Sequence, residues 1–95
     1  MQQLFDLGDT VATPGALAAL AASGQMPHPF LARHAAGDFG EVGAEDSGYN
    51  RQDLAAGQGR VLSAYTLANG QRLWAITNLV DGRGYDTCLL LPEEY

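Results

Sequence analysis

Two short turn signals in the second half of the chain constrain its fold most strongly. Asn69-Gly70 and Asp81-Gly82 are residue pairs that favour tight reversals between antiparallel strands, because both positions tolerate a positive φ. Three runs rich in strand-forming residues flank them, at Arg60–Leu67, Arg72–Leu79 and Tyr85–Leu91. The pattern therefore predicts a three-stranded antiparallel β-meander from about residue 60 to residue 91.

The register of this meander can be predicted from the first turn. A two-residue turn at Asn69-Gly70 pairs Tyr65 with Trp74, and side chains alternate between the two faces of a strand. One face is then expected to hold Val61, Tyr65, Leu67, Trp74 and Ile76, and the other Leu62, Ala64, Leu73, Ala75, Cys88 and Leu90. Both faces are apolar and short helices cover only one, so the second face or a sheet edge is left for a partner or a second copy. Alternatively, the N-terminal segment and the loops cover that face.

The part from about residue 13 to residue 57 carries helical signals. Thr13-Pro14 combines a capping residue with a proline suited to the first helical position, and Gly24 fits a helix end. Three helices are predicted, at 14–23, at 29–36 and from Ala44 to before Gly57, and Gly8–Ala12 is expected to be extended. We therefore expect one α+β domain over residues 1–95, with two to three short N-terminal helices packed on the meander.

The charge of the chain argues against nucleic acid as a direct partner. The 95 residues carry a net charge of −6, and the five basic residues are all arginines that stand singly. Phosphate recognition needs clustered cations, whereas an acidic surface repels nucleic acid and attracts basic partners. We therefore expect a protein partner, with a homodimer as one possibility, and no direct contact with nucleic acid.

No residue pattern points to catalysis. The serines do not occur in a Gly-x-Ser-x-Gly elbow, and His28, His34, Asp38 and Glu41 lack the spacing of a metal site. Cys88 lies in an apolar run typical of a buried strand, where free cysteine packs as a small hydrophobic residue. We expect no enzyme, metal or cofactor; an enzyme that uses His34 or Cys88 is the remaining catalytic alternative.

The acidic stretch from residue 38 to residue 53 is the candidate partner-binding site. Its carboxylates are Asp38, Glu41, Glu45, Asp46 and Asp53, with Arg51 as the only opposing charge. One interpretation is a negative patch that competes for the nucleic-acid-binding groove of another protein. The other is a solvated helix face whose acidic residues suit the positive end of the helix dipole.

Several motifs together resemble a family of small bacterial proteins carried on plasmids, prophages and other mobile elements. They span almost the whole chain, at Val11–Leu17, Phe30–His34, Gly37–Gly40, Glu45-Asp46, Arg60–Tyr65 and Leu90–Tyr95. Phe39 stands where the family often has tryptophan, and the turn at Asn78–Tyr85 is less charged than is usual in it. The resemblance carries over no catalytic residues. Mobile-element proteins of this size and acidity are often inhibitors of host defence, such as anti-CRISPR or anti-restriction proteins.

The sequence therefore predicts a non-enzymatic inhibitor of a bacterial defence system, with an anti-CRISPR protein as the leading hypothesis. The alternative is a homodimeric regulatory or housekeeping module of a mobile element that pairs through its sheet. Met1–Phe5 lacks the features of a secretory signal, and no apolar run approaches the ~20 residues that span a bilayer. We expect a cytoplasmic protein without a membrane partner.

Overall fold

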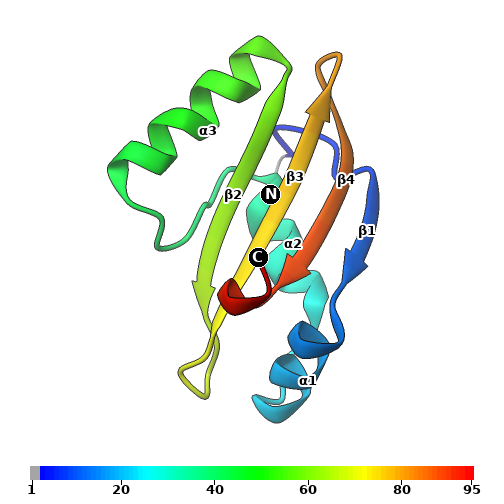
Figure 1. Ribbon diagram of the computed structural model, residues 1–95, viewed down its shortest axis with the longest axis vertical. Coiled ribbons are helices and arrows are strands. Elements are labelled where there is room, and N and C mark those ends of the chain that lie inside the picture. Colours follow the sequence, from blue (N-terminus) through cyan, green and yellow to red (C-terminus); the bar gives the residue numbers. More distant parts are fainter. Residues whose placement is uncertain (1–2) are drawn as a thin grey trace.

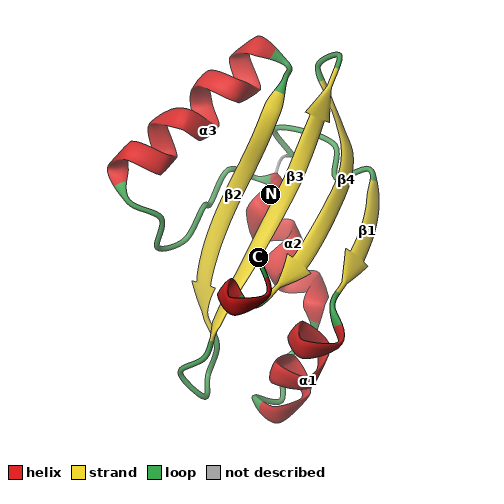
Figure 2. Cartoon of the chain, viewed as in Figure 1, coloured by secondary structure: helices red, strands yellow, loops and turns green. Residues whose placement is uncertain are grey.

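The computed structural model describes residues 3–95, so the first two residues of the Met1–Phe5 segment lie outside it. Figures 1 and 2 show the elements in chain order: β1 (Asp9–Ala12), α1 (Pro14–Ala22), α2 (Pro27–Ala35), α3 (Ala44–Ala56), β2 (Gly59–Thr66), β3 (Arg72–Val80), β4 (Arg83–Leu90) and the short 3-10 helix η1 (Pro92–Glu94). In the described part of the chain, no helix is long and apolar enough to cross a membrane.

The helices begin and end at the signals that their sequences carry. The Thr13 hydroxyl accepts a hydrogen bond from the Ala16 amide at 3.0 Å, and Pro14 occupies the first turn of α1. Gly57 ends α3 in the left-handed conformation at φ 72°, which costs little without a Cβ. The three predicted helices are confirmed, each within two residues of its predicted bounds.

The prediction of a three-stranded antiparallel meander is wrong, because the sheet has four strands of mixed orientation. Their order is β1-β4-β3-β2, and β1 runs parallel to β4 with Val11 opposite Cys88. The extended segment predicted before the first helix is therefore an edge strand. Strand β1 precedes the helices and η1 follows the sheet, so the helices and strands do not form two consecutive blocks.

The predicted register between β2 and β3 is also wrong, by one residue. The connection carries three residues, Ala68–Gly70: the Leu67 amide donates to the Gln71 carbonyl at 2.8 Å, and Gly70 adopts φ 88°. Such a loop, unlike a two-residue turn, brings Trp74 opposite Ala64. A shift of one residue moves a strand's side chains to the other face, so Trp74 and Ile76 lie with Leu62 and Ala64. The second turn, at Asp81-Gly82, has two residues as expected, and both have positive φ.

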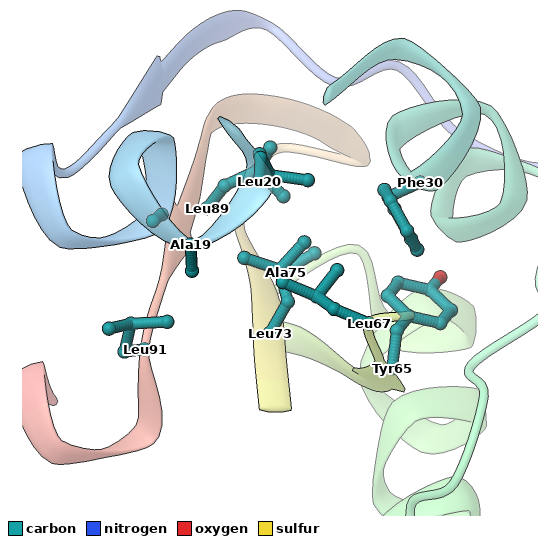
Figure 3. Close-up of a cluster of buried hydrophobic side chains, with 10 residues drawn as sticks. Ala19, Leu20, Phe30, Tyr65, Leu67, Leu73, Ala75, Leu89 and Leu91 are labelled. Atoms are coloured by element: carbon teal, nitrogen blue, oxygen red, sulfur yellow. The ribbon is translucent and has the colours of Figure 1, made fainter. Parts of the chain in front are cut away.

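Helices α1 and α2 cover one face of the sheet. Figure 3 shows Leu20 of α1 and Phe30 of α2 directed at strand residues of the main core, which include Tyr65, Leu67, Leu73, Ala75 and Leu89. The Phe30 and Tyr65 rings lie 5.5 Å apart. Each large apolar side chain that is fully buried stabilises the fold by roughly 1.5–3 kcal/mol. This core fixes which face of the sheet the two helices occupy.

No helix layer covers the opposite face, which we name the outer face. It carries Leu62, Ala64, Trp74, Ile76, Cys88 and Leu90. Helix η1 lies in front of it in Figure 1, and the Tyr95 ring that follows η1 is 5.6 Å from the Trp74 ring. The Arg60 guanidinium lies 5.6 Å from the centre of the same Tyr95 ring. The short η1 and long side chains, rather than a layer of α-helices, thus shield this face, and Trp74 stays partly exposed.

Helix α3 lies along the free edge of β2, beside the sheet rather than over it (Figure 1). The buried Asn50 side chain accepts from the Leu62 amide at 2.9 Å and donates to the Leu62 carbonyl at 2.7 Å. At Ala64 the amide donates to the Phe39 carbonyl at 3.0 Å, and the carbonyl accepts from the Glu41 amide at 2.7 Å. These bonds occupy edge groups that could otherwise pair with another chain.

We expect Asn50→Ala to destabilise the fold by about 2–4 kcal/mol, because it removes two hydrogen bonds and leaves the buried Leu62 amide and carbonyl without partners. Urea unfolding followed by circular dichroism measures the change. Gln52→Ala, an exposed position on the same helix, is the control and should stay within about 0.5 kcal/mol of the parent protein. Equal stabilities of the two variants would mean that Asn50 does not hold α3 on the sheet.

Candidate protein-binding surface

A furrow runs between α3 and the outer face of the sheet, and we name it the α3 furrow. One hollow, of about 200 Å³, is lined by Asp46, Tyr49, Asn50, Asp53, Arg60 and Leu62. A second, of about 370 Å³, is also lined by Asp46 and Leu62 and extends to Glu41, Ala64, Arg72, Trp74 and Pro92. The two hollows therefore meet at Asp46 and Leu62. The furrow combines an apolar floor with charged walls, the composition from which protein interfaces are built.

Three of the five predicted site residues lie in the furrow, but their carboxylates differ in how far they are already engaged in hydrogen bonds and ion pairs. The Glu41 carboxylate accepts from the Thr66 hydroxyl and forms an ion pair with Arg72 at 3.2 Å. The Asp53 carboxylate accepts from the Arg60 amide at 3.1 Å and so fixes the start of β2. Asp46 is exposed, and neither of the two ion pairs found among residues 3–95 includes it. Its carboxylate is thus available to a partner.

The structure places the other two predicted residues outside the furrow. Asp38 pairs with Arg33 at 2.7 Å, and this hydrogen bond lowers the pKa of the Asp38 carboxyl below its usual value. Glu45 lies in the first turn of α3, where it accepts from the Tyr49 hydroxyl at 3.3 Å and lines a shallow hollow with Gln52. The predicted acidic stretch is therefore divided among three surroundings.

Sequence reasoning missed two aromatic residues of the furrow. Tyr49 is 55% exposed, three residues after Asp46 on α3, so the helical spacing was the signal that could have found it. Trp74 was missed because the predicted register placed it on the face opposite Leu62 and Ala64. The three-residue connection at Ala68–Gly70 brings all three to one face.

A buried chain of hydrogen bonds lies on the other side of the sheet, beneath α2. His34 Nδ1 is 2.5 Å from Ser63 Oγ, and His34 Nε2 is 2.8 Å from Thr77 Oγ1. The chain continues from Thr77 Oγ1 to Thr87 Oγ1 at 2.6 Å, and from Thr87 to the Leu7 carbonyl at 2.7 Å. Ser63, His34, Thr77 and Thr87 each have 0% of their surface exposed. A substrate cannot reach the Ser63–His34 pair in this conformation.

The direction of these bonds places a proton on His34 Nε2. Thr87 gives its hydroxyl proton to the Leu7 carbonyl, so Thr77 must donate to Thr87. Thr77 then accepts from His34 Nε2–H. Burial, which disfavours the charged ring, lowers the pKa of His34 from 6.5 to about 4. The imidazole is therefore neutral near neutral pH, and its Nδ1 accepts from the Ser63 hydroxyl.

Cys88 lies half-buried on the outer face, opposite Ile76. Burial raises the pKa of its thiol, and the nearby carboxylates of Glu94 and Asp86 raise it further. A raised pKa keeps the sulfur protonated, whereas the thiolate is the reactive form. Among residues 3–95, no group of three or more histidine, cysteine, aspartate or glutamate side chains could hold a metal ion.

Comparisons with known proteins give no relative for this chain. No protein-family model, no curated protein and no solved structure matches it. The resemblance to mobile-element proteins, drawn from the sequence motifs, stays a prediction.

The buried His34 should make the fold sensitive to acid. The unfolded chain takes up a proton near pH 6.5 and the folded chain only near pH 4, so this part of the stability is complete above pH 6.5 and is lost between those values. The gap corresponds to about 3 kcal/mol. We expect His34→Gln to flatten the dependence of the unfolding free energy on pH in this window, measured by urea titrations.

His28→Gln is the matched control, because His28 is exposed. It should keep the slope of the parent protein in this window, because the stability that Asp38 contributes through its lowered pKa is lost only as the pH falls below the usual carboxyl value of 3.8. A parent slope that His34→Gln leaves unchanged would show that His34 does not stay neutral in the folded protein.

Proposed function

We propose that this chain is a protein-binding inhibitor of a bacterial defence system, without a catalytic step of its own. The observation that carries the proposal is the α3 furrow, which joins the apolar Leu62 and Trp74 to the unpaired Asp46 carboxylate. Apolar area supplies binding energy and complementary charge supplies specificity and a fast association rate. A basic protein surface is the partner that this combination fits.

The charge of the chain favours a partner that normally holds nucleic acid. Effector subunits that grip DNA or RNA neutralise phosphates with arginine and lysine side chains. A protein of net charge −6 is drawn to such a groove and repelled by nucleic acid itself. A CRISPR effector subunit is the leading target of this class. The resemblance to proteins of mobile elements supports the same choice, because such elements benefit from disarming the defences of their host.

Binding without catalysis is supported by the surroundings of the reactive side chains. The Ser63 hydroxyl and the His34 ring are fully buried within the hydrogen-bond chain beneath α2. The Cys88 thiol has a raised pKa and stays protonated near neutral pH. The groups that line the furrow are mainly charged and aromatic side chains, which suit recognition.

A homodimer that pairs through its sheet is the second candidate function. It is favoured by Val11, which is 59% exposed on β1 opposite Cys88 on the outer face. The edge of β2 carries α3, so pairing would use the outer face or the edge of β1. Light scattering separates the candidates, because a monomer at micromolar concentration contradicts a stable dimer.

We expect co-expression of this chain with its target defence system to restore phage plating. Asp46→Lys should abolish this protection, because it places a cation in the furrow against a basic partner. The readout is plating efficiency against a panel of CRISPR and restriction systems, with folding of the variant verified by circular dichroism. Asp6→Lys, which makes the same charge change at an exposed residue outside the furrow, should still protect.

Protection that survives Asp46→Lys would move the interface away from the furrow. Intact restriction by every system tested, with the chain expressed and folded, would reject the inhibitor function.

A further inference from the structure

We infer that the α3 furrow holds an arginine side chain of the partner, with the guanidinium at Asp46 and the aliphatic stem along Leu62. The inference rests on the proposed function and adds to it the chemical group that is recognised. It is carried by the charge balance of the furrow, by its aromatic residues and by an arginine site that the chain builds for itself elsewhere.

The charge balance leaves room for one cation. The furrow is lined by three carboxylates, those of Glu41, Asp46 and Asp53. It is also lined by two guanidinium groups, those of Arg60 and Arg72, so one negative charge remains unbalanced. The two arginines are already engaged, since Arg72 pairs with Glu41 and Arg60 lies over the Tyr95 ring. Of the other two carboxylates, Asp53 accepts from the Arg60 amide, whereas Asp46, where the two hollows meet, belongs to neither of the ion pairs found among residues 3–95.

Aromatic rings line both hollows next to Asp46. Tyr49 shares the first hollow with it, and Trp74 shares the second. A guanidinium stacks on such rings while it donates hydrogen bonds to a carboxylate, and its weak hydration makes it easier to desolvate than an ammonium group. The pairing of a carboxylate with tyrosine and tryptophan therefore favours arginine over lysine.

The chain already holds one of its own arginines in this way. The Arg33 guanidinium lies 4.5 Å from the centre of the Tyr65 ring, and Arg33 Nε donates to Asp38 Oδ2 at 2.7 Å. The Tyr65 hydroxyl donates to the Asp38 carbonyl at 2.7 Å and so ties the ring to the acidic residue. The furrow presents the same kinds of group, a carboxylate and aromatic rings, with the guanidinium still to be supplied.

The size of the furrow agrees with an arginine side chain. The first hollow, of about 200 Å³, has room for several waters. An arginine side chain that enters the hollow can displace this water. Its stem would cover Leu62, which lines both hollows.

Trp74 supplies the measurement, because it is the only tryptophan of the sequence and lines the furrow. The probe is Nα-acetyl-arginine amide, titrated at constant ionic strength while tryptophan fluorescence is recorded. We expect a saturable change with a Kd in the millimolar range, as suits one side chain without its protein. The citrulline analogue, which has the same shape without the charge, should produce no saturable change, and the lysine analogue should bind more weakly.

Asp46→Asn tests the position of the guanidinium. We expect it to weaken binding of the arginine probe by about tenfold or more, since it removes the charge-assisted bonds. Asp6→Asn is the matched control: it makes the same substitution at an exposed residue outside both hollows and should leave the Kd unchanged. Chemical shifts of the amides around Asp46 and Leu62 give a second readout that does not depend on fluorescence.

The titration needs no partner, so its failure is distinct from failure of the proposed function. An equal response to citrulline, or an unchanged Kd in Asp46→Asn, overturns the arginine assignment even if the chain protects phage. A saturable response to arginine that Asp46→Asn removes supports the assignment even if no defence system tested is inhibited.

Discussion

The furrow exists because one amide side chain holds a helix against the edge of a sheet. Asn50 satisfies both backbone groups of Leu62, and these are polar groups whose burial without partners costs free energy. Helix α3 has few apolar residues and could not be held by a hydrophobic stripe alone; its only fully buried residue is Asn50. The same contact closes the edge of β2 and forms one wall of the surface proposed to bind a partner.

Local sequence signals predicted the helices and strands well, but they did not predict which distant strands pair. Thr13-Pro14, Gly57 and the two turn pairs act within a few residues, so the three helices and the strands β2, β3 and β4 could be predicted from them. Strand β1 pairs with β4, whose residues lie almost eighty positions later in the sequence. A segment of four residues such as Asp9–Ala12 is too short for its sequence pattern to indicate its partner strand. The parallel fourth strand could not be predicted for this reason.

The candidate site was predicted in part, and the error over its apolar floor has one physical origin. The choice between a two-residue and a three-residue connection at Ala68–Gly70 decides which side chains of β3 enter the main core, and in the structure these are Leu73 and Ala75 rather than Trp74. Hydrophobic periodicity alone does not show which set of side chains is buried in the main core. A shift of one residue then separated Trp74 from Leu62, so the acidic stretch was recognised but its apolar floor was not. Asp38 is separate because it precedes the loop that leads to α3, whereas Glu45 and Asp46 are adjacent on α3 and face different hollows because successive helical residues point in different directions.

The two sides of the sheet use polar groups in opposite ways. Beneath α2, each hydrogen-bond donor between Ser63 and Leu7 has an acceptor. The network is complete, so none of its polar groups is free to bind a ligand. In the α3 furrow, Glu41 and Asp53 are also occupied, but Asp46 is left beside aromatic rings and an apolar floor. Folding gains little from the Asp46 carboxylate, because an exposed charge adds little to stability. A bound guanidinium would engage that carboxylate and the exposed parts of the rings, and that is the physical reason for proposing recognition on this side of the molecule.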